Sequence, residues 1–296
     1  TPYGSTRMTR NVRWTNFNYL TYKYKRNKGH AFDVMLGQET SFQGTEYLLA
    51  GATDFPFDNL ANNNLGLGAT PTTANSNRSD KMLVSFFARG NYNYRDRYLF
   101  TATVRADGST VFSKNHKWGY FPSFSAAWRI SEENFMKKQD VVSNLKLRAG
   151  WGVVGNDRIT NYLSLELYSQ GKYGYGNNVI TVLSPKQLQN EDIKWESIYN
   201  TNVGLDLDLF RNRLSFSFDY YQRITKNMIY ALSTPNSAGI TSMGGGLTAM
   251  STMPVNIGRI DNEGWELLVS YRNNIGYFNY AVSGNVSQNR NRVVDL

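Results

Sequence analysis

Three long runs of alternating side chains, all within residues 98–156, most constrain the fold of this chain. In the first run, apolar Phe100 and Ala102 alternate with polar Thr101 and Thr103, and the other two runs repeat the pattern. A period of two indicates an extended strand with two chemically different faces. The runs exceed the roughly five or six residues typical of a soluble strand. They match the about 9–11 residues with which a strand crosses a membrane in a β-barrel.

The composition argues against a helical membrane protein and against several kinds of site. Mean hydropathy is −0.49 although 14% of the residues are aromatic, and no stretch approaches the roughly 18 uninterrupted apolar residues of a transmembrane helix. The chain has no cysteine, which excludes disulfides and thiolate sites. Its net charge of +9 comes from scattered basic residues, so nucleic-acid binding is not expected. A polar barrel interior and turns beside anionic headgroups account for this charge.

The connections between the predicted strands alternate between short and long. Short links are predicted at residues 25–30, 95–97, 210–213 and 273–276. Long links are predicted at residues 50–80, 107–117, 154–194 and 224–256. A helical turn capped by Ser131 is expected before the strand at residue 145. Because outer-membrane barrels have short turns on one side and long loops on the other, the chain is predicted to be all-β. We expect an antiparallel transmembrane β-barrel of about ten strands, with long extracellular loops and short periplasmic turns.

Several motifs in the same order resemble one transporter family. The motifs are residues 98–109 (YLFTATVRADGS), 118–133 (WGYFPSFSAAWRISEE), 145–156 (LKLRAGWGVVGN), 193–196 (IKWE), 256–267 (NIGRIDNEGWEL) and 285–293 (NVSQNRNRV). They are similar to those of the SusC/RagA family, the TonB-dependent outer-membrane transporters of the Bacteroidetes. The resemblance extends from about residue 37 to the end of the chain.

The resemblance implies a 22-stranded barrel in the cell outer membrane, filled by an N-terminal plug and driven by the TonB complex. A SusD-like surface lipoprotein would cap it, and the cargo would be a glycan or a peptide. Residues 1–296 show no plug, TonB box or closing strand, so they are expected to form part of the β-barrel domain. The barrel wall would contact membrane lipid and lipopolysaccharide.

Catalysis and metal binding are not expected. The two histidines, His30 and His116, fall in a predicted turn and a predicted loop, and nothing arranges either beside a nucleophile and a carboxylate. Asp107 and Asp157 in outer loops could bind Ca²⁺, but aspartate is far commoner as a turn residue. No metal-ligand spacing and no cofactor motif is recognisable.

The best candidates for cargo binding lie in the longest predicted outer loop. Tyrosine rings stack on sugars or hold peptide side chains, and their hydroxyls form hydrogen bonds. The predicted ligand-binding residues are Tyr168, Tyr173, Tyr175 and Asp157. The alternative is a loop that only packs against its neighbours or against the lipoprotein.

Other notable residues are expected to be structural. An aromatic girdle at the membrane interfaces is assigned to Trp118, Trp128, Trp265, Tyr92 and Tyr94. Arg105 and Asp107 are expected to pair with each other rather than to contact a ligand. Residues 244–246 are three glycines in a loop, either a mobile flap or a plain flexible loop.

Three functions compete at this point. The first is active import of nutrient oligomers, and the second is a passive porin or a structural or adhesive barrel. The third is a soluble carbohydrate-binding β protein, which would need no detergent for extraction. An upstream plug with a TonB box would favour the first over the second.

Overall fold

The computed structural model describes residues 2–26, 29–57, 64–176, 178–187, 189–233 and 252–295. Ten strands form one sheet in the order β1-β2-β3-β4-β5-β6-β9-β10-β11-β12, and β7 pairs with β8 in a separate sheet. The strands are β1 (Tyr3–Arg26), β2 (His30–Thr53), β3 (Thr70–Tyr94), β4 (Tyr98–Ser109), β5 (Trp118–Arg129), β6 (Val142–Asn156), β7 (Leu167–Tyr175), β8 (Asn178–Gln187), β9 (Glu196–Leu209), β10 (Leu214–Ser233), β11 (Thr252–Ile275) and β12 (Phe278–Asp295). The prediction of an all-β chain with about ten strands in one sheet is confirmed.

The helical elements among the described residues are short. They are the 3₁₀ turns η2 (Leu65–Leu67) and η3 (Ile130–Glu132). No helix in these parts of the chain is long and apolar enough to span a membrane. The helical turn predicted near Ser131 is present as η3, but Arg129 rather than Ser131 occupies its N-cap position.

The chain divides into two compact units, which are described separately. The first comprises Thr1–Phe17 and Glu39–Val84. Within it, Thr45 donates a hydrogen bond to Asn11 across β1 and β2 (2.9 Å). A small buried cluster around Phe55 lies beside η2.

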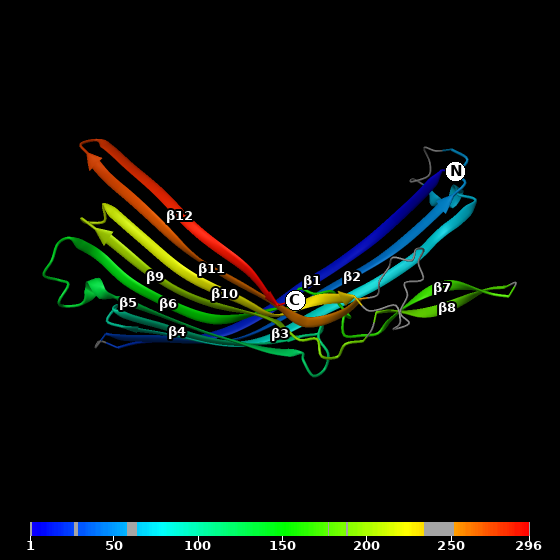
Figure 1. Cartoon of the computed structure of the whole chain (residues 1–296), viewed down its shortest axis with the longest axis horizontal. Helices are drawn as coiled ribbons and strands as arrows, with labels where there is room; N and C mark the ends of the chain where they lie inside the picture. Colours follow the sequence, from blue (N-terminus) through cyan, green and yellow to red (C-terminus); the bar gives the residue numbers. More distant parts are fainter. Residues whose placement is uncertain are drawn as a thin grey trace. The chain divides into compact units, whose positions relative to one another are not determined.

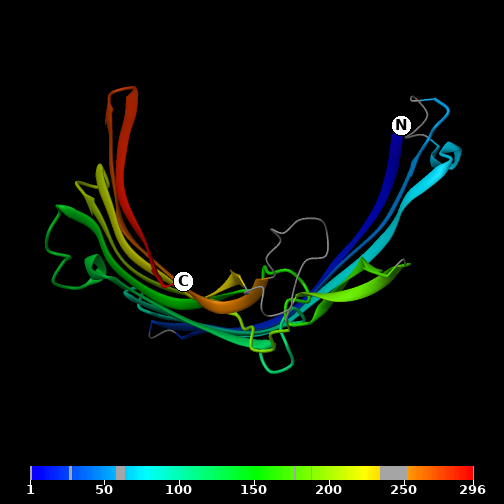
Figure 2. The ribbon, with the colours of Figure 1, turned by 45° about the vertical axis from the view of Figure 1, so that its right-hand side comes forward.

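The second unit comprises Asn18–Gln38 and Ser85–Leu296. Figures 1 and 2 show β4, β5, β6, β9, β10, β11 and β12 side by side in it. One row of paired residues, read from β4 through β5 and β6 to β9, is Phe100, Ala126, Ala149 and Val203. The adjacent row is Thr101, Ser125, Gly150 and Asn202. Because the side-chain period is two, these rows lie on opposite faces of the sheet, here named the apolar face and the polar face.

Several strands are longer than the sequence predicted, so parts of the predicted loops are wrong. β2 extends to Thr53 and β3 starts at Thr70, both within the predicted loop 50–80. β10 continues to Ser233 and β11 starts at Thr252, within the predicted loop 224–256. The predicted irregular segment 154–194 contains the β7–β8 hairpin. Backbone ladders continue through these polar stretches because they satisfy N–H and C=O groups without needing an apolar face. The glycines at 244–246 lie outside the described residues.

The predicted strict alternation of link lengths is also wrong. The short turns at residues 95–97 and 210–213 are confirmed, and their residues adopt positive φ, as at Arg95 (53°) and Arg211 (58°). The predicted link at 273–276 shortens to a turn around Gly276 (φ 61°). However, link 130–141 is longer than link 110–117, although alternation predicted the reverse. We call the end of the second unit with the turns 95–97 and 210–213 the short-turn end, and the opposite end the loop end.

Glu133 fixes the long link 130–141 at the short-turn end. Its Oε1 accepts hydrogen bonds from the Tyr98 hydroxyl (2.7 Å) and the Trp128 indole (3.2 Å). Its Oε2 lies 3.1 Å from Arg97 Nη1. The hydrogen bonds from Tyr98 and Trp128, with the charge of Arg97, lower the pKa of Glu133 below its ordinary value of 4.5. Glu133 therefore ties the link to the short-turn ends of β4 and β5.

Replacing Glu133 by glutamine should remove this stabilisation at neutral pH. The pKa of Glu133 is lower in the folded state than in the unfolded state. Its contribution to the unfolding free energy is therefore fully present above the unfolded pKa and is lost as pH falls through the folded pKa. The difference in unfolding free energy between wild type and Glu133→Gln should therefore shrink below pH 4.5. Urea unfolding across a pH series measures this free-energy difference. The control is Glu132→Gln, because the ion pair of Glu132 with Arg129 is more exposed. A difference that persists at acid pH would contradict this role.

Candidate functional site

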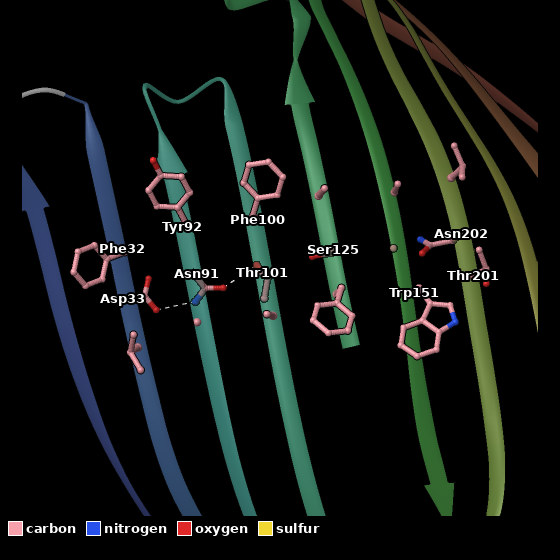
Figure 3. Close-up of a pocket in the computed structure, with 18 residues that line it drawn as sticks. Phe32, Asp33, Asn91, Tyr92, Phe100, Thr101, Ser125, Trp151, Thr201 and Asn202 are labelled. Carbon is pink, nitrogen blue, oxygen red and sulfur yellow. Dashed lines mark hydrogen bonds between the residues drawn. The ribbon is translucent and has the colours of Figure 1, made fainter. Parts of the chain in front are cut away.

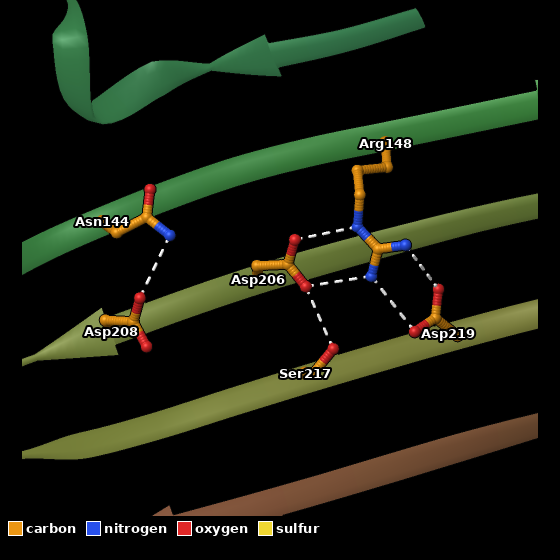
Figure 4. Close-up of polar contacts among 6 residues, drawn as sticks. All are labelled: Asn144, Arg148, Asp206, Asp208, Ser217 and Asp219. Carbon is orange, nitrogen blue, oxygen red and sulfur yellow. Dashed lines mark hydrogen bonds and ion pairs between the residues drawn. The ribbon is translucent and has the colours of Figure 1, made fainter. Parts of the chain in front are cut away.

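An ion-pair cluster centred on Arg148 occupies the polar face (Figure 4). Arg148 on β6 donates to both carboxylate oxygens of Asp206 on β9 (2.8 and 2.9 Å). It also reaches Asp219 on β10 (3.1 Å), and the Ser217 hydroxyl donates to Asp206 (3.0 Å). One guanidinium thus connects three neighbouring strands and is shared by two carboxylates.

Gly204 makes this arrangement possible. It is paired with Arg148 on one side and with Asp219 on the other. A Cβ at Gly204 would lie 2.7 Å from the guanidinium carbon of Arg148 and closer still to an oxygen of Asp219. The missing side chain therefore opens the path by which Arg148 crosses β9.

Hydrogen bonds from asparagine to aspartate continue along the polar face. Asn144 donates to Asp208 (3.1 Å) next to the Arg148 cluster (Figure 4). Farther along the sheet, Asn91 donates to Asp33 (2.7 Å) and accepts from the Thr101 hydroxyl (2.8 Å), as Figure 3 shows. In the described parts of the chain, no buried side-chain nitrogen or oxygen lacks a hydrogen-bond partner. The polar face is a wall of polar groups that are hydrogen-bonded to one another.

An aromatic core lies at the loop end. Phe112 and Ile193 are almost completely buried, and Trp195 is 7% exposed. The Trp195 ring lies 4.9 Å from that of Phe112 and 5.3 Å, edge to face, from that of Phe121. Trp195 Nε1 also donates to the Lys117 carbonyl (3.0 Å). Residues 189–195, which we call the strap, are thereby held against link 110–117.

The strap is fixed on its other side by asparagines. Asn256 accepts from the Lys194 N–H (3.0 Å) and donates to the Lys194 carbonyl (2.9 Å) and the Asn227 carbonyl (2.7 Å). Asn190 donates to the Pro254 carbonyl (2.6 Å). The strap therefore joins link 110–117 to the loop-end parts of β10 and β11.

The structure separates the four predicted cargo-binding residues. Tyr173 and Tyr175 lie on one face of β7, and Tyr168 lies on the other because the strand alternates. All three tyrosines are more than half exposed. A hydrogen bond with Glu166 raises the pKa of Tyr168 above its ordinary value. Asp157 precedes the hairpin and accepts a hydrogen bond from the buried Ser109 hydroxyl (3.0 Å).

The expected pairing of Arg105 with Asp107 is confirmed. Arg105 Nε donates to Asp107 Oδ1 (2.7 Å), and Arg105 Nη2 donates to the buried Ser85 hydroxyl (2.8 Å). In the described residues, no group of three or more histidine, aspartate or glutamate side chains is arranged to hold a metal ion. His30 shares a hydrogen bond with the Tyr92 hydroxyl (2.8 Å) and His116 lies 3.9 Å from Asp192.

Each residue assigned to the aromatic girdle contacts another ring or a polar side chain. At the short-turn end, the Tyr98 ring stacks between those of Tyr94 (6.2 Å) and Trp128 (6.3 Å) on the neighbouring strands. Toward the loop end, Trp118 stacks on Phe86 (6.2 Å). Trp265 donates to Gln288 on β12 (3.0 Å). A row of stacked rings with polar tips suits a membrane interface.

The residues that organise the site were not among the predicted site residues. Three charged residues of the site occupy polar positions of predicted strands: Arg148, Asp206 and Asp219. The sequence signal that could have pointed to them is the glycine two residues before Asp206 within the same strand, Gly204, which leaves room for a long side chain from a neighbouring strand. The Ile193–Glu196 motif and Asn256 were noticed, but their packing and hydrogen bonds come from segments far apart in sequence.

Comparison with known proteins identifies one family over residues 1–295, described as TonB dependent receptor-like, beta-barrel. TonB-dependent receptor P3 of Formosa agariphila is 34% identical over 280 residues, which is 94% of this chain and 27% of the relative. TonB-dependent receptor SusC of Bacteroides thetaiotaomicron is 36% identical over 220 residues, 72% of this chain and 21% of the relative. The RagAB peptide importer in its "closed-closed" state matches 99% of this chain and 31% of its own, at 25% identity and a TM-score of 0.85. The chain thus spans less than a third of each of these proteins.

Proposed function

Because the chain belongs to the TonB-dependent receptor β-barrel family and is of the SusC/RagA type, we propose that the full-length protein imports nutrient oligomers across the outer membrane. The observation that carries the proposal is the match of almost the whole chain to the RagAB peptide importer. This chain supplies part of the barrel wall. A plug and a TonB box elsewhere in the protein would couple it to the TonB complex, and the proposal includes no catalytic step.

In this proposal the two ends of the second unit have different roles. The short-turn end faces the periplasm and the loop end faces outward, since outer-membrane barrels place their long connections outside. The polar face lines the interior. The apolar face contacts membrane lipid. A SusD-like lipoprotein would cover the loop end.

The cargo is proposed to be a peptide or a glycan, first contacted by the β7–β8 hairpin. Tyr173 and Tyr175 present two exposed rings on one face, and Tyr168 presents a third on the other. Asp157 fixes the base of the same segment through Ser109. Aromatic rings on a projecting hairpin can hold either class of oligomer.

Import is tested by deleting the gene and measuring growth and uptake on single peptides or glycans, with and without a working TonB. TonB-dependent loss of one cargo supports the proposal. Uptake that persists without TonB would instead identify a passive porin, and no uptake phenotype would favour a structural or adhesive barrel.

Replacing Tyr173 and Tyr175 together by alanine should weaken cargo binding about tenfold or more, as loss of paired aromatic contacts does at other interfaces. Calorimetry of the full-length protein with the cargo found by uptake measures the change. Tyr277→Ala is the matched control, because Tyr277 is fully exposed in the short turn between β11 and β12. The Tyr173→Phe and Tyr175→Phe pair separates the ring from the hydroxyl. Unchanged affinity in the alanine variant would remove the hairpin from the binding site.

A further inference from the structure

A groove of about 680 Å³ crosses the apolar face of the second unit. Its two walls are stacked aromatic pairs. Tyr92 and Phe100 form one wall, with ring centroids 6.4 Å apart, and Phe124 and Trp151 form the other, at 6.1 Å. Figure 3 shows Tyr92 and Phe100 side by side on adjacent strands and Trp151 across the groove from them.

Small residues form the floor, and the strand register explains its direction. Phe100 on β4 is paired with Ala126 on β5, which is paired with Ala149 on β6. Two residues farther along β4, Ala102 is paired with Phe124. The bulky side chain on β5 therefore lies two residues farther along the sheet than the bulky side chain on β4. The small residues between these two positions leave a channel that runs diagonally across the strands.

The groove is complete within this chain. It is lined by residues of β2, β3, β4, β5, β6 and β9, and each of these strands has a hydrogen-bonded neighbour on both sides. Further barrel strands would join the sheet edge to edge, so they would not cover the groove. What fills it must approach the apolar face from the membrane.

A polar and cationic cluster lies at the short-turn side of the groove. The Tyr92 hydroxyl, on the groove wall, is hydrogen-bonded to His30 Nδ1 (2.8 Å). The His30 ring lies 4.6 Å from that of Tyr94, and the Arg95 guanidinium lies over the Tyr94 ring at 5.1 Å. An apolar channel with a cation beside one of its aromatic walls matches the two parts of a phospholipid.

We propose that this groove binds an acyl chain of a phospholipid from the periplasmic leaflet, with the lipid phosphate held beside Arg95 and His30. The inference rests on the proposed outer-membrane location. A lipid chain gains no hydrophobic energy by leaving other lipid chains, so close packing against the aromatic walls and the headgroup charge must retain it. A slender, flexible chain fits a diagonal channel between ring pairs better than the broad wall of a second barrel does.

Native mass spectrometry of the full-length protein, purified in mild detergent from vesicles of phosphatidylethanolamine and phosphatidylglycerol, tests the proposal. The double variant Ala126→Phe/Ala149→Phe fills the floor and should retain about fivefold less phospholipid. Val286→Phe is the matched control, because Val286 lies on the apolar face of β12, away from the groove. It should retain as much lipid as wild type.

A second variant tests the headgroup contact and leaves the groove intact. Arg95→Gln/His30→Gln should lower retention of phosphatidylglycerol about fivefold, the effect of one cation near an anionic headgroup. Wild-type retention in the groove-filled variant, or bound lipopolysaccharide or a second protein copy in place of phospholipid, would overturn the inference. Failure of the wild-type protein to insert into membranes would instead overturn the proposed function, and heat-dependent electrophoretic mobility reports insertion separately.

Discussion

Replacing Trp195 by alanine should release the strap from link 110–117 and destabilise the loop end by about 3–5 kcal/mol, the usual cost of removing a buried tryptophan. The indole contacts the rings of Phe112 and Phe121 and donates to the Lys117 carbonyl. Alanine would leave a cavity among rings that have little room to collapse. It would also leave that carbonyl without its indole donor.

Hydrogen–deuterium exchange of the full-length protein measures this effect locally. Exchange should accelerate in the strap and in link 110–117, while β4 and β5 stay protected by their ladder. Trp195→Phe keeps much of the aromatic packing but loses the N–H donor and part of the ring, so it should cost at least about 1 kcal/mol and less than Trp195→Ala. Trp118→Ala is the matched control because Trp118 is 48% exposed. Unchanged exchange in Trp195→Ala would show that the aromatic core does not hold the strap.

The same variant also separates loop order from cargo contact. The chain reaches the β7–β8 hairpin from Asp157, which is fixed by Ser109, and returns from it through the strap. Loosening the strap should therefore lower cargo affinity even though the tyrosines on β7 are intact.

The strands of the second unit could be predicted where the two faces of the sheet differ. Phe100 and Ala102 alternate with Thr101 and Thr103 because one face is apolar and the other polar, and β4 was predicted there. The β7–β8 hairpin has exposed apolar side chains on both faces, such as Tyr173 on one and Leu183 on the other. Such a strand has no period-two signal, and its glycines are typical of a loop. The sequence therefore predicted an irregular segment.

The site could not be predicted because it depends on register. Arg148 meets Asp206 across 58 residues of sequence, and Trp195 meets the Lys117 carbonyl across 78. Alternation assigns each residue to a face but does not say which residue of the next strand lies opposite it. By contrast, Arg105 and Asp107 are two residues apart on one strand face, and their pairing could be predicted.

Replacing Arg148 by methionine should destabilise the barrel by about 2–3 kcal/mol. Removing one member of a buried ion pair costs about 3–5 kcal/mol, and the Arg148 side chain is 30% exposed, so screening reduces the cost. Asp206 and Asp219 would then be left close together on adjacent strands, because Gly204 provides no bulk between them. Methionine fills much of the same volume, so the loss reports charge rather than a cavity.

Neutralising the two carboxylates separates pairing from packing. The triple variant Arg148→Met/Asp206→Asn/Asp219→Asn also removes the two unpaired carboxylate charges. Its unfolding free energy should lie within about 1 kcal/mol of wild type, since replacing a whole ionic cluster is often nearly neutral. Urea unfolding in lipid vesicles measures all three proteins. Equal loss in the single and triple variants would mean that Arg148 acts through packing across β9. Recovery in the triple variant would show that Arg148 is required because the two aspartates are present.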